Sequence, residues 1–315
     1  MNHIKRKRTT LIALAAVLLW ALGYPRSDPP PKDPRPHIAA TTTMLYELTA
    51  AIAGDAAVVI ALMGPGVDPH LYQATAGDMA RLQEADAIVY NGLHLEGRLS
   101  ALLDGLADPR VICAASGIDA SLLLSDAENP GLYDPHIWLD PALWRLAAIH
   151  IAGQLSALDA ANAAVYIENL GMYLAGLEAL DSYNRERFAS IPEANRVLVT
   201  AHDAFGYFGR AYQFQTRGLQ GISTDTEAGA ADVMALADFV AARRLPAIFN
   251  EAAIPPKAIR ALQEAAAAKG HTPQIGGTLH VDALAPGQSY VQTMRGNADI
   301  IAGALGSDEA ESTAK

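Results

Sequence analysis

The stretch Val197-Leu198-Val199-Thr200-Ala201-His202-Asp203 joins an apolar run to a polar turn and places a histidine where they meet. A short apolar run that ends in turn residues predicts a buried strand of the kind found in parallel sheets. In open sheets of this kind, ligands bind beyond the carboxyl ends of the strands. His202 therefore stands where an α/β protein would present a residue that binds a ligand.

Strand and helix patterns alternate on both sides of this stretch. Expected strands occupy residues 37–41, 57–62, 87–90 and 110–114 before it, and 215–220, 247–250 and 272–275 after it. Helical patterns occupy residues 43–53, 95–106, 226–244, 256–270 and 289–302. This alternation predicts βαβ units with parallel sheets.

Residues 160–188 carry apolar side chains at helical intervals and contain no proline. A helix of about thirty residues is long for a globular protein, and this one separates the two strand–helix series. We therefore expect an α/β fold of two Rossmann-like lobes with parallel sheets, joined by a long rigid helix. The expected boundaries are 37–140 for the first lobe, 141–190 for the connecting helices and 191–305 for the second lobe.

The N-terminus has the features of an export signal. A basic segment, Lys5-Arg6-Lys7-Arg8, precedes apolar residues 11–22, and Ala21-Leu22-Gly23 provides small residues for a signal peptidase. We expect a signal peptide at 1–23, a proline-rich linker at 24–36 and a polar tail at 306–315. The expected location is the periplasm, and an uncleaved leader would instead leave the chain anchored to the membrane.

The composition argues against several classes of partner and site. The 315-residue chain has a formal net charge of −11, so nucleic acids and anionic lipids are not expected partners. Its single cysteine, Cys113, permits neither an intrachain disulfide nor a zinc site built from several cysteines. A transition-metal site in this chain would therefore use histidine and carboxylate side chains.

Two copies of one tripeptide, Asp68-Pro69-His70 and Asp134-Pro135-His136, occur in a chain with nine histidines. The proline restricts the backbone before each histidine, which lowers the entropic cost of fixing the imidazole. With His202 and a fourth candidate, Asp282, they provide three imidazoles and one carboxylate, a tetrahedral donor set for Zn²⁺. Each expected lobe contributes two of the four, so the site is expected in the cleft between the lobes.

These residues also have structural explanations. The three histidines are compatible with turn, capping or hydrogen-bonded core positions. His280 lies two residues before Asp282, so on an extended segment both face the same side, and His280 is an alternative ligand or a gate. Glu251 directly follows an expected strand, and we expect an acid that supports the site without binding the metal.

Four segments resemble the TroA/ZnuA family, the cluster A-I solute-binding proteins of zinc and manganese ABC transporters. They are residues 196–212 (RVLVTAHDAFGYFGRAY), 218–224 (GLQGIST), 68–75 (DPHLYQAT) and 134–140 (DPHIWLD). The resemblance runs from about residue 37 to residue 305. It implies two α/β lobes on a rigid helix with a metal between them, and its ligands carry over to His70, His136, His202 and Asp282.

The sequence departs from the family pattern in two places. Residues 283–288, after Asp282, are not glycine-rich, so Asp282 is the ligand with the least support. Residues 116–133 lack a histidine-rich loop, so the metal is expected to arrive without one or through another protein, such as a metallochaperone. Three histidines favour Zn²⁺ over Mn²⁺, which prefers carboxylate oxygens. Mn²⁺ stays an alternative, because some relatives with this histidine pattern resemble manganese or dual-metal binders.

Three functions are compatible with these features. The first is an exported binding protein, expected to be a monomer and not an enzyme, that captures Zn²⁺ and delivers it to the membrane permease of an ABC importer. The second is an exported zinc metallohydrolase with three histidine ligands, an open position and Glu251 or Asp203 as the base. The third is a metal-binding adhesin or storage protein. Ligation by Asp282 separates the first from the second, because a fourth protein ligand closes the site.

Overall fold

The computed structural model describes residues 33–126 and 129–306. The expected signal peptide, residues 24–32 of the expected linker and the tail from residue 307 lie outside the described residues. Residues from Pro36 onward cluster as one unit. In the described part of the chain, no helix is both long and apolar enough to cross a bilayer.

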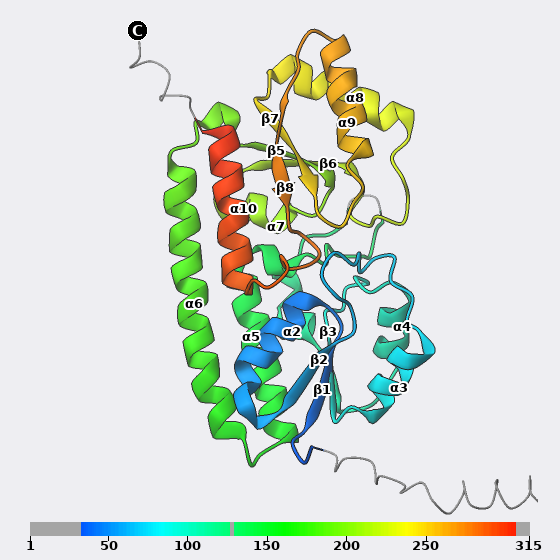
Figure 1. Cartoon of the computed structure of the whole chain (residues 1–315), viewed down its shortest axis with the longest axis vertical. Helices are drawn as coiled ribbons and strands as arrows, with labels where there is room; N and C mark the ends of the chain where they lie inside the picture. The colour runs from blue at the N-terminus through cyan, green and yellow to red at the C-terminus, as the bar shows by residue number, and fades with distance from the viewer. Residues whose placement is uncertain (1–32, 127–128, 307–315) are drawn as a thin grey trace, which may run out of the picture. The chain divides into compact units, whose positions relative to one another are not determined.

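The first lobe is a four-stranded parallel sheet with helices on both faces (Figure 1). Its strands, in the spatial order β2-β1-β3-β4, are β2 (Val58–Ala61), β1 (His37–Ala40), β3 (Ala87–Tyr90) and β4 (Val111–Cys113). Its helices are α2 (Thr43–Ala53), α3 (Ala76–Glu84) and α4 (Arg98–Asp104). Short, mostly apolar strands suit a sheet that is covered on both faces, as the alternating sequence predicts.

Two antiparallel helices, α5 (Pro141–Leu158) and α6 (Ala163–Ala189), follow the first lobe. Pro141 is the first residue of α5, where its missing N–H costs nothing, and Asp140 caps the helix by accepting the Ala142 N–H at 2.9 Å. Helix α6 runs alongside the first lobe and the adjoining part of the second (Figure 1). The long connecting helix expected from the sequence is therefore present.

The second lobe repeats the strand–helix alternation. Its strands are β5 (Val197–His202), β6 (Gln215–Gln220), β7 (Ala247–Glu251) and β8 (Gln274–Leu279), and its helices are α7 (Gly206–Tyr212), α8 (Ala230–Arg243), α9 (Lys257–Ala268) and α10 (Tyr290–Leu305). Strand β5 pairs with β6 and β7 with β8, both in parallel. Helix α10 leaves this lobe and packs beside α6 (Figure 1). The α/β fold with two lobes is therefore confirmed.

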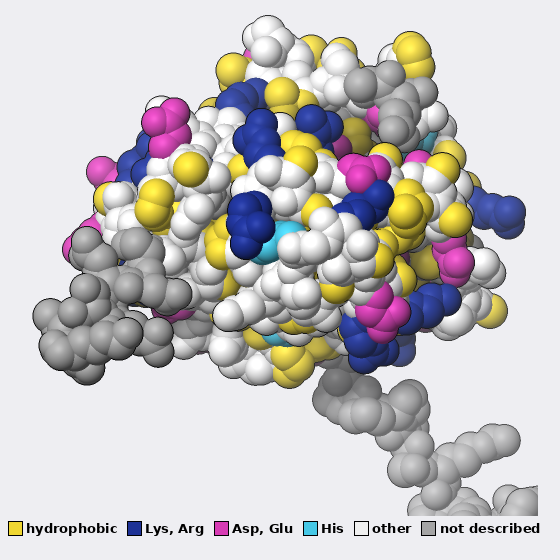
Figure 2. Space-filling model, turned by 90° about the horizontal axis from the view of Figure 1, so that it is seen from above, with side chains coloured by type: hydrophobic (Ala, Val, Ile, Leu, Met, Phe, Trp, Pro, Cys, Tyr) yellow, Lys and Arg dark blue, Asp and Glu magenta, His cyan; other side chains and the backbone are white. Residues whose placement is uncertain are grey.

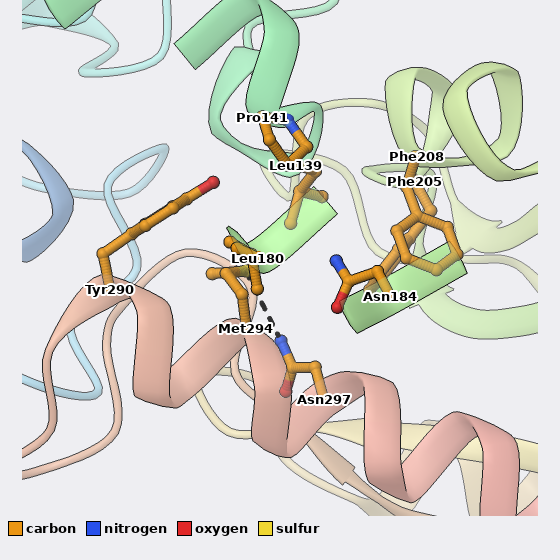
Figure 3. A pocket seen from close by; sticks show the side chains of 9 residues that line it. All are labelled: Leu139, Pro141, Leu180, Asn184, Phe205, Phe208, Tyr290, Met294 and Asn297. Atoms are coloured by element: carbon orange, nitrogen blue, oxygen red, sulfur yellow. Dashed lines mark hydrogen bonds between the residues drawn. The ribbon is translucent and has the colours of Figure 1, made fainter. Parts of the chain in front are cut away.

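One apolar core joins the two lobes. It includes Leu45 of the first lobe, Trp144 of α5, Leu180 of α6, and Phe205 and Ile301 of the second lobe, all essentially without exposed surface. Where α5, α6, α7 and α10 meet, side chains from all four surround a cavity of only about 10 Å³ (Figure 3), close to the smallest space that holds one water molecule. The lobes are therefore firmly packed together on this side of the molecule.

Three element boundaries differ from the sequence expectations. Helix α4 begins at Arg98 and not at residue 95, because Leu93, His94 and Gly97 have positive φ angles that a helix cannot contain. Helix α8 begins at Ala230 and not near residue 226, because the Asp232 carboxylate caps it by accepting the Gly229 N–H at 2.8 Å. Strand β8 continues to Leu279 through two glycines that the β-propensity disfavours.

Side chains of both charges are exposed on the end formed by the second lobe. Viewed from this end, Lys and Arg side chains lie in the middle and on the right of the face, with acidic side chains at the left and among them (Figure 2). This end of a protein with a net charge of −11 is therefore of mixed sign.

Candidate metal centre

The structure brings together the four side chains expected from the sequence. His70 lies in the loop between β2 and α3, His136 just before a short 3₁₀ turn, His202 at the end of β5, and Asp282 in the loop between β8 and α10. One donor atom from each lies within 4.8 Å of the donor atoms of the other three, and all four residues are buried. The cluster lies in the cleft between the lobes, with two side chains from each.

The spacing of the donors suits a small cation. The His136 Nε2 atom lies 3.3 Å from Nε2 of His70 and 3.2 Å from Nε2 of His202. Around a tetrahedral Zn²⁺ with metal–nitrogen bonds of 2.0–2.1 Å, neighbouring nitrogens are about 3.3 Å apart. Oδ1 of Asp282 lies 3.6 Å from Nε2 of His136, and Oδ2 of Asp282 lies 3.5 Å from Nε2 of His202.

Two further carboxylates fix the orientation of two of the rings. The Nδ1 atom of His136 lies 2.7 Å from Oδ1 of Asp134, and Nδ1 of His202 lies 2.5 Å from Oε2 of Glu251. A ring that donates Nδ1–H to a carboxylate presents the lone pair of Nε2 to the site. Glu251 also accepts the His202 backbone N–H at 2.9 Å, so the expectation of a supporting acid at this position agrees with its contacts.

The Asp282 carboxylate receives no hydrogen bond from the described residues. Among the described residues, both of its carboxylate oxygens are buried and accept no hydrogen bond. Burial raises its pKa to about 7, with the positive charge of His202 opposing that shift. A carboxylate in such a place is costly unless a cation accompanies it, so the cluster has the chemistry of a cation site.

The three histidines have different proton affinities. Burial, together with the neighbouring imidazoles, lowers the pKa of His70 and of His136, which keeps these rings neutral. Burial also opposes charge on His202, but the carboxylates of Glu251 and Asp282 outweigh it and raise the pKa of His202 to about 10. Without a metal, His202 is therefore protonated. Its Nε2–H can donate a hydrogen bond to the Nε2 lone pair of the neutral His136 ring, 3.2 Å away.

The loop that carries Asp282 is attached to the first lobe and to α10. The indole Nε1–H of Trp138 donates to the Val281 carbonyl at 2.8 Å, and the Leu284 N–H donates to the Thr43 hydroxyl at 2.8 Å. On the other side, the Asn297 amide accepts the His280 N–H and donates to the His280 carbonyl. These contacts position Asp282 even though the residues that follow it are not glycine-rich.

His280 lies near the cluster without belonging to the set of four donors. Its backbone is fixed by Asn297, and burial lowers the pKa of its half-buried ring. The structure therefore gives no support to His280 as an alternative ligand.

A buried acid that the sequence analysis missed organises the loop between β3 and α4. Glu96 accepts hydrogen bonds from the Thr41 hydroxyl at 2.7 Å, the Asn91 N–H at 2.6 Å and the Ser100 hydroxyl at 2.7 Å. The Asn91 amide donates in turn to the Pro135 carbonyl, next to His136. A Cβ atom at Gly97 would come within 3.0 Å of the His70 carbonyl oxygen, so this strained loop touches both tripeptides. Nothing local in the sequence points to this acid.

Glu47 is a second residue whose role the sequence does not reveal. It is not simply solvated, because its carboxylate accepts the Tyr290 N–H at 3.1 Å and the Tyr173 hydroxyl at 3.2 Å. Burial raises the pKa of Glu47, and these two hydrogen bonds oppose the shift. The acid thereby joins α2 of the first lobe to α6 and to the start of α10.

Two α/β lobes that share a core on one side and bury a cluster of potential metal donors between them are typical of two-lobed solute-binding proteins. The comparisons with known proteins agree with this class. The family model described as "Zinc-uptake complex component A periplasmic" matches residues 38–304, and the chain belongs to this family.

Individual relatives show how close the likeness is. The chain is 42% identical over 280 residues to the zinc-binding protein TroA of Treponema pallidum, covering 87% of this chain and 90% of the relative. It is 41% identical over 253 residues to the manganese-binding lipoprotein MntA of Bacillus subtilis, covering 80% and 82%. The solved structure of the periplasmic zinc-binding protein TroA from Treponema pallidum superposes with a TM-score of 0.83 at 43% identity, covering 87% of this chain and all of that one.

Proposed function

We propose that this protein is the solute-binding component of a metal ABC importer, and that it captures Zn²⁺ through His70, His136, His202 and Asp282 and delivers it to the membrane permease. The observation that carries the proposal is the convergence of four buried donors from both lobes within 4.8 Å of one another. The unpartnered oxygens of Asp282 support it, because a bound cation would satisfy them.

The donor set favours Zn²⁺ over Mn²⁺. Three imidazole nitrogens and one carboxylate suit the borderline character of zinc, whereas manganese prefers more oxygen donors. One relative is named for zinc and another for manganese at nearly the same identity, so Mn²⁺ is the second cargo to test.

Four protein donors leave no open position for a reacting water molecule, which favours binding and release over hydrolysis. Glu251, one of two candidate bases of a hydrolase, is engaged by both the ring and the backbone N–H of His202. We therefore propose a carrier and no catalytic activity.

The proposed location is the periplasm, reached through cleavage of the leader at 1–23, with the lobes bounded as expected from the sequence. We also propose that the protein acts as a monomer. Delivery of the metal by a metallochaperone is consistent with the absence of histidine from residues 116–133.

Titration of the metal-depleted protein with Zn²⁺ and with Mn²⁺ tests this function. We expect one tight Zn²⁺ per chain, weaker Mn²⁺ binding, and strong loss of affinity in His202→Ala and in Asp282→Ala. His280→Ala is the matched control and should bind as the parent does. If Asp282→Ala binds Zn²⁺ as tightly as the parent, the closed four-donor site is wrong and an open site must be considered.

A further inference from the structure

The four proposed ligands are not equally enclosed. His136 and His202 have no exposed surface and Asp282 is 3% exposed, whereas His70 is 6% exposed and the next residue, Leu71, is 53% exposed. The loop between β2 and α3 that carries His70 contains no regular element. His70 therefore lies nearest to solvent and is attached to a segment without regular structure.

The two sides of the cleft are closed in different ways. On the helical side, formed by α5, α6 and α10, the shared apolar core joins the lobes (Figure 1). Buried hydrogen bonds reinforce this side, including the one from the Tyr290 hydroxyl to the Trp138 carbonyl at 2.6 Å. Opening the helical side would expose large aromatic side chains, which is costly.

On the loop side, a polar contact joins the His70 loop, residues 62–75, to the loop between β6 and α8, residues 221–229. The Thr224 hydroxyl of the second lobe donates to Oδ2 of Asp68 in the first lobe at 2.7 Å. The other oxygen of the same carboxylate, Oδ1, accepts the His70 N–H at 2.9 Å. Thr224 is buried, while its neighbours Asp225 and Thr226 are exposed.

We propose that Thr224 is a positioning residue that holds His70 in place through Asp68, and that the metal enters and leaves past His70 when this interlobe contact opens. The inference rests on the proposed function and adds the route of the metal and the residue that controls its release. Because the contact is made between the lobes, it stabilises the closed state and should slow dissociation far more than it speeds association. The helical side acts as the fixed side of this movement.

Release kinetics of the Zn²⁺-loaded protein test the proposal. Thr224→Val keeps the shape of the side chain and removes the hydroxyl. Loss of one hydrogen bond should raise the rate of release to an excess of chelator about two- to tenfold, with little change in the rate of binding. Thr224→Ser retains the hydroxyl and should release at the parental rate. Thr226→Val, an exposed threonine of the same loop, is the matched control and should also behave as the parent.

A double-mutant cycle identifies the partner of Thr224. Asp68→Ala should raise the release rate more than Thr224→Val, because it also removes the acceptor of the His70 N–H. In the Asp68→Ala background, Thr224→Val should have no further effect, since the interlobe contact is already lost. Fully multiplicative effects of the two substitutions would show that Thr224 does not act through Asp68.

Hydrogen exchange locates the opening. In Thr224→Val, exchange should become faster in residues 66–75 and 221–229 and stay unchanged around Val281 and Tyr290. Faster exchange on the helical side instead, or an unchanged release rate in Thr224→Val, would overturn the proposal. If the parent bound no metal at all, the proposed function itself would fail. Tight binding by the parent with unaltered release from Thr224→Val would reject this inference and leave the proposed function standing.

Discussion

The two Asp-Pro-His tripeptides have the same sequence and the same local structure, but different surroundings. In both, the aspartate accepts the backbone N–H of its histidine at 2.9 Å. The remaining bonds of the two aspartates differ: Asp134 contacts the ring of His136, whereas Asp68 accepts the hydroxyl of Thr224 from the other lobe. One motif therefore places one proposed ligand in the core and a second proposed ligand on the loop side, where the lobes are joined by the Thr224–Asp68 contact.

This difference shows that the tripeptide sets the backbone and that tertiary contacts set the function of the aspartate. His136 packs against Trp138, with ring centroids 5.2 Å apart, in the core that joins the lobes. His70 lies on the loop side, beside exposed Leu71. We expect substitutions in the first tripeptide to act mainly on metal exchange, and those in the second to act on both metal affinity and stability.

Removal of the ligands should have the largest effect. His136→Ala and His70→Ala should each weaken Zn²⁺ binding by more than the roughly 10- to 100-fold typical of residues that only support a ligand. His136→Ala should also destabilise the metal-free protein, by about 1–3 kcal/mol, because it removes a buried ring and its hydrogen bond. Zinc titration and thermal unfolding without metal check both expectations. Equal loss of stability in the two variants would contradict the distinction between the tripeptides.

Substitution of one aspartate should act mainly on the affinity for Zn²⁺, and substitution of the other mainly on the rate of Zn²⁺ release. Asp134→Asn should weaken Zn²⁺ binding about 10- to 100-fold, because the amide no longer orients the His136 ring as a carboxylate does. Asp68→Asn should change affinity less and act mainly through faster release. Equilibrium titration combined with stopped-flow release distinguishes these outcomes, and the reverse pattern would mean that the ring of His70 depends on its aspartate in the same way.

Above pH 8, the pH dependence of binding should reflect His202. Because the pKa of His202 is raised to about 10, the metal-free site holds a proton at pH 8 that the metal must displace. Zinc affinity should therefore rise about tenfold per pH unit between pH 8 and 9. Below pH 7 the slope should steepen, because burial raises the pKa of the Asp282 and Asp134 carboxyls to about 7 and both then take up protons. Calorimetry in buffers of different ionisation enthalpy counts these protons, and binding without proton release at pH 8 would be inconsistent with a charged His202.

The prolines should have the smallest effect. Pro135→Ala should lower the free energy of unfolding by about 0.4–1 kcal/mol, through greater freedom of the unfolded chain, and leave zinc affinity unchanged. Pro69→Ala should instead weaken zinc binding about two- to fivefold, because the loop around it gains freedom in the folded protein. Denaturant unfolding and zinc titration of both variants make the comparison. A similar loss of affinity in both would mean that the core does not hold His136 rigidly.

The fold and the four proposed ligands could be predicted because local signals carry them. Apolar runs of strand length, caps such as Asp140 and the unbroken helical pattern of α6 are properties of neighbouring residues. His202 follows its strand directly, so the end of β5 could be expected to present it to the cleft. The repeated Asp-Pro-His tripeptide identified His70 and His136 as candidates.

The supporting contacts could not be predicted because their partners lie far away in the sequence. Glu47 meets Tyr290 across 243 positions, and Thr224 meets Asp68 across 156. Only the folded chain brings such pairs together. The start of α4 was misplaced for a related reason, because the buried carboxylate of Glu96 holds the preceding loop in left-handed conformations that its sequence alone does not require.

The position of α10 has a consequence for the order in which the protein becomes functional. A ribosome makes this helix after every other described element, and its Asn297 and Tyr290 fix the segment that carries Asp282 and the Trp138 carbonyl beside it. Three of the four donors are therefore synthesised well before the fourth can be placed. A nascent or truncated chain that ends before residue 290 lacks the helix that completes the cluster, so synthesis through α10 is a precondition for retaining cargo.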